Sequence, residues 1–181
     1  MLVRHRVLVR HVRAVALAVS LLVDLAHGPR AFAQGVNAPA PATGVSAIRN
    51  GELSAAIERA VTGARRRLAQ NACAAVFADF TTEDGRTLAE VAASLAMSAE
   101  QTLVRVIFLD GGESVSCRAT RPAAFTGVGS RVVFVCPTTF RTLDRETAEL
   151  VIIHELLHTL GLGERPPSSS DINKTVARRC S

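Results

Sequence analysis

The residues from Leu143 to Leu160 form the most regular segment of the chain. Apolar side chains recur there at helical spacing, and Gly161 follows as a residue that stops a helix. The segment is therefore predicted to be a helix. His154 and His158 are four residues apart, so in a helix they lie about one turn apart on the same face. Glu155 follows His154 directly and is rotated from it by about 100° around the helix axis.

This spacing predicts a metal site. Each imidazole can place a ring nitrogen about 2.0 to 2.1 Å from one Zn²⁺ ion. Glu155 would then lie beside the metal, where it can deprotonate a zinc-activated water as general base. The alternative is a buried helix with two hydrogen-bonded histidines. His154 and His158 are the only histidines beyond residue 33, and by composition alone the pattern should arise in fewer than about one in a hundred chains of this length.

A third ligand is expected shortly after the helix. Glycine has no steric cost at positive φ, so Gly161 can end the helix in a left-handed turn. The chain then reverses, and Glu164 can return to the metal. Asp171, seven residues further on, is the competing candidate. The alternative without a metal is a surface ion pair between Glu164 and Arg165.

The residues His154-Glu155-x-x-His158-x-x-Gly161-x-x-Glu164 resemble the metzincin form of the zincin metallopeptidase motif, with Glu164 where that group usually has His or Asp. The stretch from Arg131 to Cys180 is also similar to a group of small exported bacterial metallopeptidases. The resemblance implies a zincin-like fold, a Zn²⁺ cofactor and a peptide or protein substrate. It also implies His154, His158 and Glu164 as metal ligands and Glu155 as the catalytic base.

The N-terminal residues predict export. Residues 1–13 carry four arginines and no acid, residues 14–23 are apolar, and Ala31-Phe32-Ala33 fits a cleavage site. This three-part pattern is typical of a secretory signal peptide, here 1–33, and predicts a periplasmic or extracellular protein. The apolar run is shorter than the roughly 20 residues that cross a bilayer, so no stable membrane anchor is expected after cleavage. Residues 34–45 read as a flexible Ala- and Pro-rich leader, and 46–181 as a single catalytic domain.

Net charge argues against a nucleic-acid partner. The chain has a formal charge of +5, but residues 1–33 hold five arginines and one aspartate. Without them the charge is about +1, which is not the basic excess typical of nucleic-acid binding. Nothing in the sequence indicates the oligomeric state.

The four cysteines all follow residue 33, and an even number in an exported protein predicts two disulfides. Cys117 with Cys136, on neighbouring predicted strands, and Cys73 with Cys180, joining the end of the first helix to the C-terminus, are the favoured pairs. Four cysteines allow three pairings, and the sequence leaves the others open.

The element order predicts an α+β fold with N-terminal helices, a small and mostly antiparallel sheet, the helix of His154, and a short C-terminal helix. Helices are expected at 52–69, at 87–97 and from Asp171 onward. Strands are expected at 103–109, 114–118 and 131–136, with a loop at 119–130.

Peptide hydrolysis is the expected activity. The alternatives are a zinc hydrolase acting on a non-protein amide, such as cell-wall peptide, and a non-catalytic exported zinc-binding domain. Because the chain has no Tyr, Arg165 or backbone N–H groups are the candidate oxyanion stabilisers. A peptide could add a strand to a sheet edge, for which Arg131 to Cys136 and Ser114 to Arg118 are the candidates.

Overall fold

A computed structural model of the chain describes residues 48–181, so the predicted signal peptide and leader lie outside the described residues. The described part is α+β, as predicted. Its elements in order are α1 (Gly51–Leu68), α2 (Asn71–Ala74), η1 (Ala75–Phe77), α3 (Leu88–Ser94), α4 (Ala99–Thr102), η2 (Leu103–Arg105), β1 (Ile107–Asp110), α5 (Val115–Ala119), β2 (Ala124–Thr126), β3 (Val132–Val135), α6 (Pro137–Phe140), α7 (Arg145–Thr159) and α8 (Ser169–Cys180).

The N-terminal helix forms where the periodicity predicts it. Asn50 caps α1, because its side chain accepts hydrogen bonds from the backbone N–H groups of Glu52 and Leu53, both at 3.1 Å. The apolar face of α1 is buried against α7. The second predicted helix is shorter than expected: α3 begins with a capping box formed by Thr87 and Glu90 and ends at Ser94.

The sheet differs from the prediction in its pairing. Its strand order is β1-β3-β2, with β1 and β3 parallel and β2 and β3 antiparallel, so the expectation of a mostly antiparallel sheet is wrong. The strand expected at 114–118 is the helix α5, which Ser114 caps by accepting from the backbone N–H of Cys117. The chain therefore does not return beside β1, and β3 takes the place next to it.

The structure differs from the prediction at one further strand and at one strand boundary. The expected loop at 119–130 contains the three-residue strand β2. Pro122 and Gly127 lie close to either end of it, and because these residue types are typical of loops, the sequence predicts no strand there. The expected strand at 103–109 begins only at Ile107, because residues 103–105 form the 3₁₀ turn η2. The third expected strand, at 131–136, is β3 and is confirmed.

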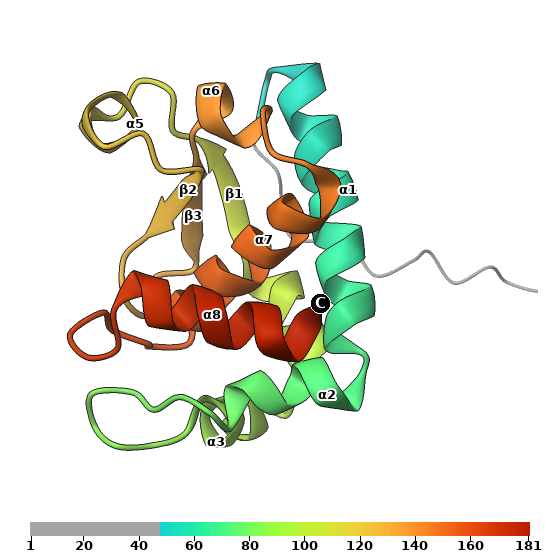
Figure 1. Cartoon of the computed structure of the whole chain (residues 1–181), viewed down its shortest axis with the longest axis vertical. Coiled ribbons are helices and arrows are strands. Elements are labelled where there is room, and N and C mark those ends of the chain that lie inside the picture. Colours follow the sequence, from blue (N-terminus) through green and yellow to red (C-terminus); the bar gives the residue numbers. More distant parts are fainter. Residues whose placement is uncertain (1–47) are drawn as a thin grey trace, which may run out of the picture. The chain divides into compact units, whose positions relative to one another are not determined.

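Helix α7 lies between the sheet and α1 (Figure 1), in contact with both. Helix α8 also packs on α7 and reaches α2 at its C-terminal end. The core between these elements is aliphatic and aromatic, with Phe77, Phe108 and Phe140 among its fully buried side chains. Among residues 48–181, no helix is long and apolar enough to cross a membrane.

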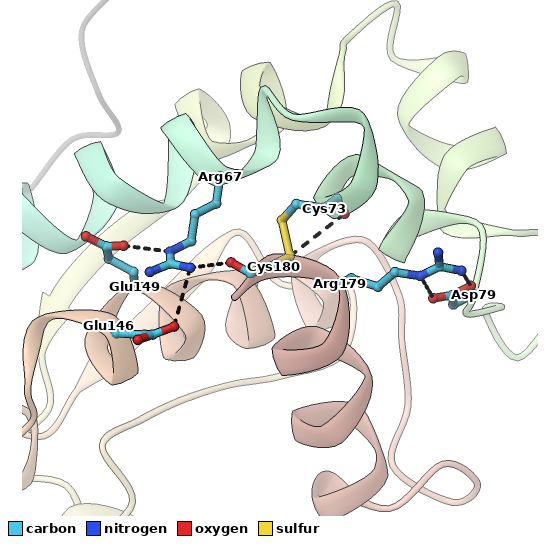
Figure 2. Close-up of a disulfide and its surroundings, with 7 residues drawn as sticks. All are labelled: Arg67, Cys73, Asp79, Glu146, Glu149, Arg179 and Cys180. Atoms are coloured by element: carbon cyan, nitrogen blue, oxygen red, sulfur yellow. Dashed lines mark hydrogen bonds and ion pairs between the residues drawn. A yellow bond between two sulfur atoms is a disulfide. The ribbon is translucent and has the colours of Figure 1, made fainter.

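The cysteines pair in the way the sequence favoured. One disulfide joins Cys73, in α2, to Cys180, the last residue of α8, across 107 residues (Figure 2). The other joins Cys117 to Cys136. The prediction that Cys117 and Cys136 lie on neighbouring strands is wrong, since Cys117 lies in α5. Of the elements that the two disulfides join, α5 has no buried residue of its own.

Candidate metal centre

Helix α7 carries both predicted histidines. It begins at Arg145, two residues later than predicted, because Asp144 caps it by accepting from the backbone N–H of Thr147 at 2.9 Å. The flanking apolar residues bury α7 on nearly all sides, and His154, Glu155 and His158 are each only 6% exposed. Three buried polar side chains on one turn of a core helix need partners, because an unpaired polar group loses its hydration on burial.

Gly161 ends α7 as predicted, with a φ of +106°. Its N–H donates to the carbonyl of His158, and the N–H of Leu162 donates to the carbonyl of Leu157, at 3.0 and 3.2 Å. This pair of bonds is a Schellman motif, which reverses the chain at a helix end. The reversal brings Glu164 back over the two histidines.

The three predicted ligands meet at one point. Nε2 of His154 lies 3.0 Å from Nε2 of His158. Oε1 of Glu164 lies 3.8 Å from the first nitrogen and 3.3 Å from the second. Ligand atoms about 2.05 Å from a tetrahedrally coordinated zinc ion are about 3.3 Å apart, so the triangle has the right size for one ion.

The chemistry of these atoms also suits a cation. Nδ1 of His158 lies 2.8 Å from the carbonyl oxygen of Leu162, which can only accept, so the Nε2 lone pair of His158 is free. Nδ1 of His154 lies 2.7 Å from Oδ1 of Asn173 on α8. Donation to that oxygen leaves the Nε2 lone pair of His154 free as well. Two lone pairs and a carboxylate oxygen then converge, which is an arrangement of acceptors that a cation stabilises.

Glu155 lies beside this triangle and is not part of it. Its Oε2 is buried and has no hydrogen-bond partner among the described residues. Burial, and after it the negative charge of Glu164, raise the pKa of Glu155 to about 8. Burial also lowers the pKa of His154, with the nearby His158 acting in the same direction. A buried carboxyl group with a raised pKa beside a candidate metal site can exchange a proton with a molecule in the site near neutral pH.

A cavity of about 560 Å³ opens onto these groups, and its lining includes His154, Glu155, His158 and Glu164. The edge strand β2 forms another wall of it. Both peptide-binding edges considered from the sequence are therefore wrong: β3 is the central strand, and residues 115–119 are helical. The edge beside the site is β2, whose three residues were too short a pattern to recognise.

The competing residues lie elsewhere. Asp171 is exposed at the start of α8, where it accepts from the Ser168 hydroxyl and lies 3.6 Å from Lys174. Among the described residues, the group of side chains that could hold a metal ion contains Glu164 and not Asp171. Arg165 is exposed and is not among the residues that line the cavity.

Sequence reasoning missed two members of the site. Asn173 and the carbonyl of Leu162 each hold the far nitrogen of one histidine. Every residue has a backbone carbonyl, so the sequence does not show which carbonyl binds a histidine. Asn173 follows His154 by 19 residues, and a single sequence gives no reason to connect them.

Comparison with protein-family models, with curated proteins and with solved structures found no match to this chain.

Proposed function

We propose that this chain is an exported zinc-dependent peptidase, with His154, His158 and Glu164 as metal ligands and Glu155 as general base. One observation carries the proposal. Three acceptor atoms from α7 and the turn after it converge with separations of 3.0, 3.3 and 3.8 Å, in the same cavity as a buried carboxyl group whose Oε2 has no partner among residues 48–181.

Each side chain has a separate role in this proposal. When bound, Zn²⁺ would supply Lewis-acid polarisation of the substrate carbonyl and acidification of water. Glu155 accepts a proton from the attacking water while the water oxygen bonds to the carbonyl carbon. Glu155 then gives that proton to the amide nitrogen as the carbon–nitrogen bond breaks, so the base is regenerated. Glu164 is held over the histidines by the turn at Gly161 and completes the ligand set.

A peptide is the substrate that the surroundings favour. Within the described sheet, β2 pairs only with β3, so its other side has backbone groups free for pairing. An extended peptide in the cavity can bond to that side as an added strand. The backbone of β2 would then align the scissile bond beside α7. The edge of β2 thus takes the place of the two peptide-binding edges expected from the sequence, at 131–136 and 114–118.

Metal content is the first test. The oxidised protein, purified from an exporting host and dialysed against a weak chelator, is expected to hold one zinc ion per chain. His154→Ala should abolish binding, because it removes one of two nitrogen ligands. Glu164→Ala should weaken it, and Asp171→Ala is the matched control that should leave it unchanged. Absence of zinc from the folded wild type after incubation with the metal would refute the proposal.

Substrate class is the second test. A mixed peptide library and a digest of cell-wall peptide are incubated separately with the zinc-loaded protein and analysed by mass spectrometry. New termini in the library, absent with Glu155→Gln, support peptidase activity. Cleavage confined to the cell-wall digest would favour a hydrolase of that material, and no cleavage of either by a zinc-loaded protein would favour a non-catalytic domain.

A further inference from the structure

We infer that Asn173 is a positioning residue that holds His154 in the orientation and tautomer needed to bind the metal. The inference rests on the proposed function, since it concerns the geometry of one proposed ligand. Oδ1 of Asn173 lies 2.7 Å from Nδ1 of His154, the nitrogen that faces away from the candidate site.

The contact matters because an imidazole binds a metal through an unprotonated nitrogen. If Oδ1 of Asn173 accepts from Nδ1–H of His154, the lone pair of Nε2 points at His158 and Glu164. If the amide were turned so that its NH₂ group donated to Nδ1, the proton would move to Nε2 and block the site. The orientation of the Asn173 amide therefore decides whether His154 can be a ligand.

Helix α8 is well suited to hold this contact in place. Ile172 and Val176, on either side of Asn173, are almost fully buried. At the C-terminal end, Arg179 forms two bonds to the carboxylate of Asp79 at 2.8 and 2.7 Å, and Cys180 is in the disulfide to Cys73 (Figure 2). Asn173 thus presents its amide from a helix fixed at its core face and at its end.

The position of Asn173 separates this role from a merely structural one. The residue is exposed overall, while His154 is 6% exposed. Alanine also has a higher helix propensity than asparagine. Replacing Asn173 by Ala should therefore leave the metal-free fold at least as stable as before. The change should remove only the hydrogen-bond partner of Nδ1 of His154.

The test measures metal affinity and metal-free stability in the same variants of the full oxidised chain. Zinc affinity is measured by competition with a chromogenic chelator, Co²⁺ coordination by visible absorption, and stability by urea denaturation. Asn173→Ala is expected to bind zinc about 10- to 100-fold more weakly, the usual effect of losing an outer partner of a ligand. Its urea midpoint should be equal to that of the wild type or higher. Asn173→Asp, which can only accept at its ionised carboxylate, should bind zinc at least as tightly as the wild type.

Lys174→Ala on the same helix is the matched control and should change neither quantity, since Lys174 is exposed and its one ion pair among residues 48–181 is with Asp171. Wild-type affinity in Asn173→Ala would overturn the inference while leaving the proposed function intact. Weak binding by both Asn173→Ala and Asn173→Asp, together with a lowered urea midpoint, would overturn it in favour of a structural role. Failure of the wild type to bind zinc or Co²⁺ would remove the proposed function and this inference together.

Discussion

Helix α7 carries two buried polar clusters that differ in one respect. Near its start, Glu149 is bound by Arg67 at 2.7 Å and Arg145 at 2.9 Å (Figure 2 shows the contact with Arg67). Near its end, Glu155 has a buried oxygen without a partner among the described residues, and the histidines offer only acceptors to the candidate site. The first cluster is complete, in the sense that both carboxylate oxygens of Glu149 have partners. The second is incomplete, because Oε2 of Glu155 has none among the described residues.

The pKa values of the two glutamates show the same contrast. Burial acts to raise the pKa of Glu149, but the hydrogen bonds from Arg67 and Arg145 outweigh it and hold that pKa below its ordinary value. Burial and the charge of Glu164 raise the pKa of Glu155 to about 8. A Cβ atom at Gly63 would lie 2.0 Å from Oε1 of Glu149, so even the backbone of α1 leaves room for the first cluster. A buried polar group without a partner is uncommon in a native protein and needs an explanation, which the proposed metal site supplies for Glu155.

The contrast predicts opposite effects of the same substitution at the two glutamates, and the largest is on catalysis. Glu155→Gln should lower kcat of the zinc-loaded protein by about 10⁴-fold, the upper end for loss of a general base. Apart from the proposed ligand Glu164, no other carboxylate lines the described cavity. Zinc content and metal-free unfolding free energy should stay near the wild-type values, because Oε2 makes no bond that the change would break. An inactive Glu155→Gln that had also lost its zinc would contradict the separation of base from ligands.

The second prediction concerns α8, which touches the Glu149 cluster at its C-terminal residue and the histidines through Asn173 in its first half. The carbonyl of Cys180 accepts a hydrogen bond from Arg67, and Asn173 on the same helix holds His154 (Figure 2 shows the first contact). Removing the disulfide with Cys73→Ala and Cys180→Ala should lower the free energy of unfolding by about 4 to 5 kcal/mol in the chain-entropy model. Urea denaturation of the oxidised proteins measures it. Because both clusters depend on α8, zinc affinity should fall as well; unchanged affinity would mean that α8 keeps its place without the disulfide.

Much of this arrangement could be predicted from the sequence, for reasons that are local. The histidine spacing and Gly161 fix which side chains share a face and where the chain reverses, so His154, His158 and Glu164 could be placed together before the structure was known. The pairing of the strands could not. It depends on α5, where the Ser114 hydroxyl accepts from the backbone N–H of Cys117 and caps a helix, and on β2, which is too short to show alternation.

Contacts between distant segments were equally hidden. Asn173 and Glu149 are ordinary polar residues in the sequence, and nothing marks one as the partner of His154 and the other as the partner of Arg67. The residue type of a polar side chain does not show its role until its partners in the folded chain are known. The completeness of a cluster is a property of the folded chain, which is why the contrast on α7 could not be predicted.

The third prediction applies the matched change to the complete cluster. Glu149→Gln should lower the free energy of unfolding by about 3 kcal/mol, since it removes the negative charge and places an NH₂ group opposite one of the two arginine donors. The zinc content of the folded protein should be unchanged, because Glu149 is not among the proposed metal ligands. Chemical denaturation and metal analysis of Glu149→Gln and Glu155→Gln together make the comparison. Equal stability losses in the two variants would break it.

The smallest expected effect is at the ion pair of Asp79 and Arg179, which holds the C-terminal end of α8 together with the disulfide (Figure 2). The hydrogen bond from Arg179 holds the pKa of Asp79 below its ordinary value, against the opposing effect of burial. A carboxyl group with a lowered pKa in the folded state stabilises the fold above its unfolded pKa of about 3.9, and this contribution is lost as the pH falls through the folded value.

Because Asp79 and Arg179 are partly exposed, the contribution should be below about 1 kcal/mol. The measurement is the unfolding free energy of the wild type and of Asp79→Asn from pH 7 down to pH 2.5. The difference should be constant down to about pH 5 and shrink below it as Asp79 takes up its proton. A difference that persisted unchanged to pH 2.5 would show that Asp79 acts by packing and not by its charge. Zinc affinity measured at pH 7 should be the same in both proteins, since the disulfide and the buried face of α8 still hold Asn173 against His154.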